Sequence, residues 1–417
     1  MAFLAPSVSL HQAMQQHDLT GNEHGYFVYD LDLLASHLNK LQQQDVVKLW
    51  YAVKANPLSK VVETMAQSGI QFDVASRGEL TQVLAQNVPS SKVLNTGPAK
   101  SKAQIGEFLS VGVNTFVVES INQLRWLQEA AVEQGKSPRA LLRVQLRWPE
   151  GEKNPLGGNS LTPFGLGTDE WSDITAADFP AVELCGLHIF QWGNMLSNAK
   201  MFELWSQMVA PLVSLANTVG FELKVLDLGG GLGVDYLGQG QGIDWQTAVA
   251  DLAKIKESAG VEELWLELGR YAVAECGYYV TDIIDRKTNF GEQQLVLAAG
   301  INHLLRPAIT DQPFPAALLR NVKSNKVQCE TSDPLSDTQH FHIHGPLCTS
   351  MDCLGVLPLP TDVEVGDKLM FSFAGAYGFT ESMPLFLCHE VAAEYVFTEQ
   401  EGMVCVRAAQ PASWYLR

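Results

Sequence analysis

Short apolar runs alternate with longer segments of helical periodicity along the first two thirds of the chain. Runs rich in Val, Leu, Ile and Phe predict eight strands, at 49–53, 72–74, 93–94, 116–118, 141–146, 184–190, 225–228 and 264–266. Between them, apolar residues recur every three or four positions, which predicts helices such as 60–69, 121–135 and 199–220, each ending at glycine. Strands and helices that alternate in this way predict an α/β fold, a (β/α)8 TIM-type barrel, with a doubly wound sheet as the alternative.

The pattern changes after residue 275, where β-rich runs separated by Gly and Pro replace the helical segments. Examples are YYVTDIIDRK, QQLVLAA, KLMFSFA and VAAEYVFTEQ. Such runs without intervening helices indicate a second, mostly antiparallel β-domain. We therefore predict a barrel over residues 28–275 and a β-domain over residues 276–417.

The composition indicates a protein with a substantial core and little affinity for polyanions. The 417 residues are 46% hydrophobic, and 46 Asp and Glu against 28 Lys and Arg give a formal net charge of −18. This charge argues against nucleic acid and anionic membranes as partners. We find no apolar stretch of about 20 residues and no signal-peptide pattern, so we expect a cytoplasmic protein.

The seven cysteines are odd in number and follow no framework spacing, which indicates reduced thiols. Residue types that bind zinc gather in one segment, at His342, His344, Cys348 and Cys353. The segment has neither a C-x2-C pair nor a second ligand pair of the zinc type. We therefore predict no metal site.

A lysine follows an apolar run in the segment WYAVKANP, residues 50–57. A buried ammonium is costly unless it is paired, neutralised or used chemically. Lys54 is therefore either a lysine that reaches solvent at the end of a strand or a desolvated nucleophile of the kind that forms Schiff bases. The rest of the sequence has to decide between these two interpretations.

Two glycine stretches follow the seventh and eighth predicted strands. LDLGGGLGVDY contains Gly229, Gly230, Gly231 and Gly233, and LELGRY contains Gly269 and Arg270. In barrel enzymes these two loops commonly bind phosphate, because bare backbone N–H groups can approach an anion. The dinucleotide pattern G-x-G-x-x-G is not met, since Val234 occupies its last position. A lysine after the first strand together with this phosphate site is the arrangement expected for pyridoxal phosphate.

Eight segments in order carry a resemblance to a known family: YFVYDLDLL (26–34), YAVKANP (51–57), FDVASRGEL (72–80), LDLGGGLG (226–233), LELGR (266–270), GINHLLRPA (300–308), GPLCTSMD (345–352) and GAYGF (375–379). Through them the chain resembles the fold-type III pyridoxal-phosphate decarboxylases, the family of diaminopimelate, ornithine and arginine decarboxylases, over almost its whole length. The resemblance implies an alanine racemase-like architecture in which residues 1–27 join the β-domain. It also implies a head-to-tail homodimer whose active sites use residues of both chains.

The resemblance also implies roles for individual residues of the barrel. Lys54 matches the Schiff-base lysine, and Asp73 is the acidic residue expected beside it. Glu267 matches the carboxylate that faces the pyridine nitrogen and keeps it protonated, which strengthens the electron sink. Alanine racemases of the same barrel place arginine there, so Glu267 favours decarboxylation over racemisation.

The phosphate and the reacting carbon have further family-matched partners. The phosphate group is expected to contact Gly229, Gly230, Gly231, Gly269, Arg270 and Tyr377. Cys348 matches the cysteine that the partner chain supplies and that returns a proton to the α-carbon, as a thiol can do near neutral pH. Asp352 matches a position that contacts the far end of the substrate.

Departures from the family pattern bear on the substrate. Thr349 stands where diaminopimelate decarboxylases usually have a glutamate that binds the far amine. In GLHIFQWGN, Phe190 replaces the usual ring-stacking histidine, so either Phe190 or His188 could stack on the cofactor ring. Arg306, which meets the far carboxylate in diaminopimelate decarboxylases, is retained, and it implies a substrate with a second carboxylate.

These features together predict a pyridoxal-phosphate-dependent amino-acid decarboxylase. Its substrate is expected to carry a carboxylate or conjugate at the far end, as in a citryl-linked intermediate of siderophore biosynthesis. The alternatives are a meso-diaminopimelate decarboxylase of lysine biosynthesis, a racemase, and a catalytically dead homologue that acts as a binding protein.

Overall fold

The computed structural model describes residues 3–18, 24–148, 161–240, 242–319, 329–330 and 337–416. The chain forms two compact units. The barrel unit comprises His37–Val234 and Gln241–Ala272, and the β-unit comprises Met1–Ser36, Asp235–Gly240 and Val273–Arg417. Relative to the predicted division, the β-unit also takes in residues 28–36 and 273–275 and a short segment from within the barrel sequence.

The barrel unit is a closed ring of parallel strands. Its members in chain order are β2 (Val47–Ala52), β3 (Gln71–Val74), β4 (Val93–Asn95), β5 (Thr115–Val118), β6 (Arg139–Gln145), β8 (Glu183–His188), β9 (Val225–Asp227) and β10 (Glu263–Leu268). Sequential strands pair, β10 returns to β2, and the β5–β6 pairing closes the ring. The predicted (β/α)8 barrel is confirmed, and the doubly wound alternative is wrong because that sheet has two open edges.

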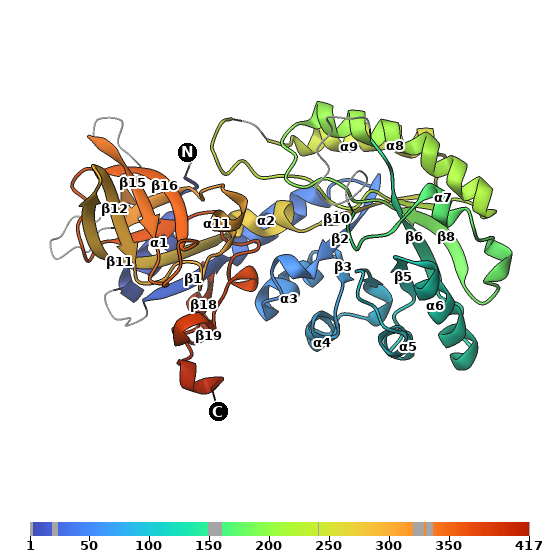
Figure 1. Cartoon of the computed structure of the whole chain (residues 1–417), viewed down its shortest axis with the longest axis horizontal. Coiled ribbons are helices and arrows are strands. Elements are labelled where there is room, and N and C mark those ends of the chain that lie inside the picture. Colours follow the sequence, from blue (N-terminus) through green and yellow to red (C-terminus); the bar gives the residue numbers. More distant parts are fainter. Residues whose placement is uncertain are drawn as a thin grey trace. The chain divides into compact units, whose positions relative to one another are not determined.

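Helices connect the barrel strands and lie outside the ring (Figure 1). They are α3 (Ser59–Gln67), α4 (Arg77–Ala85), α5 (Lys102–Ser110), α6 (Ile121–Gln134), α7 (Thr168–Trp171), α8 (Asn198–Val219) and α9 (Trp245–Ala259), with the short strand β7 (Leu166–Gly167) before α7. The short helix α10 (Arg270–Val273) follows the last barrel strand. Serine or aspartate caps begin several of them; for example, Ser120 accepts a hydrogen bond from the Gln123 amide. Among the helices that the structure describes, none has the length and apolar character needed to cross a membrane.

An apolar layer fills the interior of the barrel. Its buried members are Trp50, Leu94, Val117, Leu141, Cys185, Val225 and Trp265. The rings of Trp50 and Trp265, on the paired strands β2 and β10, lie 4.8 Å apart. Because alternate residues of a strand face the same side, the next inward positions toward the carboxyl ends of the strands lie directly beyond this layer.

The β-unit is built on a mostly antiparallel sheet, as predicted. Its strands are β1 (Gly25–Asp30), β11 (Gly277–Asn289), β12 (Glu292–Leu297), β13 (Ala316–Leu319), β14 (Cys329–Glu330), β15 (Thr338–His344), β16 (Cys353–Pro360), β17 (Lys368–Phe371), β18 (Ala393–Thr398) and β19 (Gly402–Arg407). Its helices are α1 (Val8–Asp18), α11 (Arg306–Thr310) and the first part of α2 (Leu31–Leu41). β1 pairs with both β11 and β18, so the N-terminal segment forms a central strand of this sheet.

Candidate active site

A layer of buried polar side chains lies at the carboxyl ends of the barrel strands, beyond the apolar layer. Its members are Asp73, Thr96, Glu119, Arg143, His188, Asp227 and Glu267. Most of them follow a residue of the apolar layer by two positions, as Glu267 follows Trp265. Barrel enzymes carry their active sites at this end, so this polar layer is the candidate site.

Glu267, His188 and Asp227 form the centre of the polar layer. One ring nitrogen of His188 and one carboxylate oxygen from each acid all lie within 4.8 Å of one another. His188 Nε2 is 3.3 Å from Glu267 Oε1. Burial raises the pKa of Glu267, but attraction by His188, Lys54 and Arg143 outweighs it, so the net shift is downward. Burial, together with the charge of Glu267, raises the pKa of Asp227 well above its ordinary value. Glu267 is therefore the ionised member of the carboxyl pair.

Asp73 lies at the end of β3 in the same layer. It accepts a hydrogen bond of 2.5 Å from the Thr96 hydroxyl. Burial and the nearby charge of Glu267 raise the pKa of Asp73 to about 8, although Lys54 opposes the shift. The structure thus places Asp73 and Glu267 in the same layer, close enough for their charges to interact, and leaves the proton on Asp73 near neutral pH.

Lys54 lies in a turn rather than at the end of a buried strand. β2 ends at Ala52, and Lys54 occupies the middle of the 3-10 turn Val53–Ala55, where its neighbours are buried and its own side chain is exposed. The exposure of Lys54 agrees with the first of the two interpretations, a lysine that reaches solvent, and its role as the Schiff-base lysine stays a prediction. Its charge still acts on the polar layer, since Lys54 is among the groups that lower the pKa of Asp73 and Glu267 against the effect of burial.

The glycine loop after β9 packs so closely that side chains are excluded. A Cβ atom at Gly230 would lie 2.3 Å from the Glu267 carbonyl oxygen, and one at Gly229 would lie 2.5 Å from the Phe190 Cβ. Gly229 and Gly231 also have positive φ angles of 63° and 106°. The Gly229 amide donates to Asp227 Oδ1 at 2.8 Å. The loop is thereby fixed against β10 within the polar layer.

Gly269 and Arg270 follow β10 directly in the barrel unit, and both are half-buried. Phe190 is also half-buried and packs on the glycine loop, whereas His188 is 1% exposed and reaches Glu267. Both candidates for ring stacking thus lie beside the predicted cofactor residues. The choice between Phe190 and His188 stays a prediction.

Three charged residues of the polar region were missed by the sequence reasoning. Arg143 and Glu119 form a buried ion pair of 3.0 Å, and the Gly165 amide donates to the second Glu119 oxygen at 2.8 Å. Lys100 is 3% exposed and donates to the Gly97 carbonyl. Burial lowers the pKa of Lys100 to about 8, although the charge of Glu119 opposes the shift. Arg143 could have been identified as a buried charge from the sequence, because it interrupts the apolar run LLRVQ.

Replacing Arg143 by methionine is expected to destabilise the barrel unit. Methionine leaves the Glu119 carboxylate buried without its counter-ion, and breaking a buried pair from one side typically costs about 3–5 kcal/mol. Urea unfolding followed by tryptophan emission measures this loss, because every tryptophan except Trp414 lies in the barrel unit.

The matched control for this prediction is Lys102→Met. Lys102 pairs with Glu129 on the surface, where the two side chains are 54% and 50% exposed. Removing such a pair is expected to cost less than about 1 kcal/mol. Equal losses in the two variants would contradict the importance of burial for the Arg143–Glu119 pair.

In the β-unit, Arg306 begins α11 and has an acidic partner. Its Nη1 lies 2.9 Å and 2.6 Å from the two carboxylate oxygens of Glu381. The guanidinium carbon lies 4.4 Å from the centre of the Tyr377 ring. Tyr377 lies in a turn after β17 with a φ of 53°, which is uncommon for a residue other than glycine. The structure thus brings two predicted site residues together and adds Glu381, which the sequence reasoning missed.

Cys348, Thr349 and Asp352 lie in the loop between β15 and β16. Cys348 is exposed and Thr349 is half-buried. Asp352 is 2% exposed, and its two oxygens accept hydrogen bonds from the Ile301 and Leu347 amides at 2.8 Å and 2.7 Å. Asp352 therefore ties the loop that precedes Arg306 to the loop that carries Cys348. This geometry favours a structural role over the predicted substrate contact.

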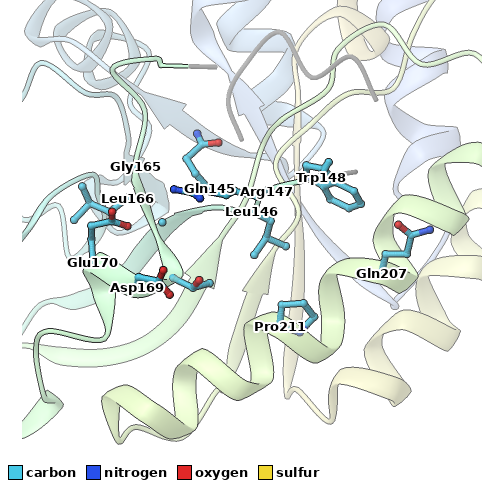
Figure 2. A pocket seen from close by; sticks show the side chains of 12 residues that line it. Gln145, Leu146, Arg147, Trp148, Gly165, Leu166, Asp169, Glu170, Gln207 and Pro211 are labelled. Atoms are coloured by element: carbon cyan, nitrogen blue, oxygen red, sulfur yellow. The ribbon is translucent and has the colours of Figure 1, made fainter. Parts of the chain in front are cut away.

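A cavity of about 590 Å³ opens on the barrel unit, and its lining includes Gly165, whose amide donates to Glu119. Figure 2 shows Asp169 and Glu170 of α7 on one side of this cavity and Gln207 and Pro211 of α8 on another. None of the residues predicted from the sequence as site residues lines it.

Comparison with known proteins identifies the family. Residues 31–274 match the family described as pyridoxal-dependent decarboxylase, pyridoxal binding domain. The 2-[(L-alanin-3-ylcarbamoyl)methyl]-2-hydroxybutanedioate decarboxylase of Staphylococcus aureus is 29% identical over 90% of this chain and 94% of its own length. The diaminopimelate decarboxylase of Pseudomonas fluorescens is 31% identical over 80% of this chain and 77% of its own length.

A solved structure agrees with this result at the level of the fold. The crystal structure of diaminopimelate decarboxylase from Helicobacter pylori complexed with L-lysine superposes on this chain with a TM-score of 0.83. The match covers 97% of this chain and 98% of that chain, at 20% sequence identity. The family match spans more than half of the sequence and includes the whole polar layer of the barrel. The chain therefore belongs to the pyridoxal-dependent decarboxylase family and is a pyridoxal-phosphate-dependent decarboxylase.

Proposed function

We propose that this enzyme decarboxylates an α-amino acid whose far end is a citrate-type amide, as a step of siderophore biosynthesis. The match to the Staphylococcus aureus decarboxylase carries the proposal, because it extends over 94% of that protein. The substrate in that relative's name is an alanine unit joined through an amide to a hydroxylated dicarboxylate. Its far end thus offers the second carboxylate that Arg306 implies.

The residues of the polar layer fit pyridoxal phosphate. The glycines of the loop carry no side chains, so backbone N–H groups of Gly230 and Gly231 can approach a phosphate group closely. Glu267 is buried and its pKa is lowered, chiefly by His188, so it is ionised as a carboxylate that keeps a ring nitrogen protonated has to be. Bound pyridoxal phosphate supplies an electron sink for the carbanion that forms when CO2 leaves the α-carbon.

The residues of this chain have separate tasks in the proposed reaction. Glu267 holds a proton on the ring nitrogen, and Gly229, Gly230 and Gly231 bind the phosphate together with Gly269, Arg270 and Tyr377. Lys54 provides the Nζ atom that attaches the cofactor covalently. Arg306 binds the far carboxylate and so orients the α-carboxylate for departure.

We further propose that the enzyme is a homodimer with shared active sites. Cys348 of one chain then holds the proton that the α-carbon of the substrate in the other chain's site receives. The exposed position of Cys348 in a loop of the β-unit supports this role, because a residue that serves a second chain has to lie on the surface. Thr349 beside it would contact the same substrate.

The second candidate substrate is free meso-diaminopimelate. Several relatives that match about 80% of this chain are named diaminopimelate decarboxylases, including that of Haemophilus influenzae at 30% identity. Thr349 in place of the family's glutamate argues against it, whereas Glu381 beside Arg306 offers a different carboxylate for an amine.

Measurement of CO2 release decides between the two substrates. With the citryl conjugate of 2,3-diaminopropionate, kcat/KM is expected to exceed the value for meso-diaminopimelate by about 100-fold or more, since each unmatched polar group in a specific site is costly. A higher value with meso-diaminopimelate would select the second candidate. A fresh preparation without bound cofactor and without activity on either compound would instead favour a binding protein.

A further inference from the structure

The cavity of the barrel unit combines apolar surface with charged side chains that face solvent. Its volume of about 590 Å³ lies within the range of about 300–1,000 Å³ that is usual for small-molecule sites. Leu146 and Pro211 contribute apolar surface, and Arg147, Asp169 and Glu170 are the charged residues of its lining. All three charged residues are exposed, so a ligand can reach them from solvent.

The cavity keeps its cationic and anionic side chains apart. Arg147 follows the carboxyl end of β6, whereas Asp169 and Glu170 lie in α7. Within the described part of the chain, no ion pair or hydrogen bond joins these three side chains to one another or to any other residue. Figure 2 shows the two acids on one side of Arg147 and Gln207 of α8 on the other. A ligand with charges of both signs can therefore bridge the cavity.

The wall that carries the two acids is held in place by the barrel itself. β7, which precedes α7, pairs with the end of β6. The Gly165 amide donates to Glu119 at 2.8 Å, and the Trp171 indole donates to the Arg143 carbonyl at 2.8 Å. Both ends of the segment from Gly165 to Trp171 are thus tied to buried residues of the barrel. A wall that is already ordered lowers the entropy cost of binding.

The charges of the cavity define the class of ligand that it fits. One arginine and two carboxylates leave the lining with an excess of one negative charge. A ligand with one carboxylate and two ammonium groups balances this charge. The planar guanidinium binds a carboxylate through two N–H groups, and each ammonium donates to a carboxylate. The methylene groups between the charged ends can cover the apolar surface of Leu146 and Pro211.

We infer that this cavity is a separate ligand site of the enzyme, which binds a diamino monocarboxylic acid. Arg147 binds the carboxylate of the ligand, and Asp169 and Glu170 bind its two ammonium groups. None of the residues that we assign to the cofactor or to the substrate lines the cavity. The inference therefore goes beyond the proposed function and does not depend on it.

Titration calorimetry of the wild-type holoenzyme with L-lysine tests the site, because lysine carries one carboxylate and two ammonium groups. Arg147→Met is expected to weaken the binding of lysine by roughly 10- to 100-fold, the usual cost of losing hydrogen bonds between charged groups. Glu170→Gln and Asp169→Asn are each expected to weaken it as well. Norleucine lacks the second ammonium and cadaverine lacks the carboxylate, so both are expected to bind at least about 10-fold more weakly than lysine.

Controls separate the cavity from the catalytic site and from general effects of charge. Arg125→Met and Asp173→Asn change exposed residues of the barrel unit outside the cavity, and both are expected to leave the affinity for lysine unchanged. Holoenzyme that has been reduced with borohydride can no longer react with the amine of the probe through its cofactor. It is expected to bind lysine as tightly as the untreated holoenzyme.

Each outcome bears on the inference without involving the proposed function. No binding of lysine to the wild-type holoenzyme at about 10 mM overturns the inference, since the site would then be weaker than any ordinary ligand site. Binding that Arg147→Met and Glu170→Gln leave unchanged, or that borohydride reduction abolishes, places lysine elsewhere and overturns it too. Norleucine that binds as tightly as lysine overturns the assigned class of ligand. An absence of turnover with both proposed substrates overturns the proposed function and leaves the result of the lysine titration as it is.

Discussion

Replacement of Lys54 by alanine is expected to bring turnover below detection. Alanine removes the Nζ atom that attaches the cofactor, and no buffer group can take the same place in the site. In the wild-type holoenzyme, borohydride reduction followed by peptide mapping is expected to place the cofactor on Lys54. The variant is expected to lose this covalent label while it keeps the fold, because Lys54 lies exposed in a turn.

A second lysine makes this labelling experiment decisive. Lys100 is 3% exposed, and burial lowers its pKa to about 8, so it has the chemical character that we predicted for Lys54. If the label appears on Lys100, the assignment of Lys54 is wrong. Lys60→Ala, which changes another exposed lysine of the barrel unit, is the matched control and is expected to retain both label and activity.

The fold could be predicted because its signal is local. Each buried barrel strand is a short apolar run, and each helix between strands has its own periodicity, so a window of the sequence is enough to recognise the element. The strand predicted at 184–190 illustrates the limit of this approach. β8 ends at His188, two residues before the end of the predicted strand. Ile189 and Phe190 continue the apolar run in the sequence, but in the structure they belong to the loop that packs on Gly229.

Site residues that lie in sequence motifs could be predicted, whereas residues that join the site only through contacts between distant segments were missed. Glu267 and Asp73 lie in recognisable segments, and the structure places both in the polar layer. Arg143 and Glu119 are separated by 24 residues and acquire their meaning only when β5 and β6 pair. No local window shows that these two charges neutralise each other.

The same reasoning explains the two residues whose surroundings differ from expectation. Lys54 follows an apolar run, but it lies within the 3-10 turn Val53–Ala55 and is exposed although both its neighbours are buried. Asp352 lies four residues from Cys348 in a family motif, yet its carboxylate binds backbone amides. A family motif in the sequence shows that a residue belongs to the region of the site. Whether the residue supports the site or contacts the substrate depends on its hydrogen-bond partners, which only the structure shows.

Replacement of Cys348 by alanine is expected to lower turnover by roughly 10²–10⁴-fold, the usual contribution of a positioned proton donor. Cofactor absorbance is expected to stay at the wild-type level, because Cys348 is not among the predicted phosphate contacts. Cys405→Ala removes another exposed cysteine of the β-unit and is the matched control, with unchanged turnover. A loss of cofactor from Cys348→Ala would contradict the role of this thiol as a proton donor alone.

Mixing the Cys348→Ala and Lys54→Ala proteins tests whether the two residues come from different chains. If Cys348 serves the partner's site, a mixed dimer has one site with both residues intact and one site with neither. Under conditions that exchange subunits, half of the dimers are mixed, so activity is expected to recover to about a quarter of the wild-type value. If Lys54 and Cys348 serve the same chain's site, every site in the mixture lacks one of them, and activity stays at the level of the separate variants despite demonstrated exchange.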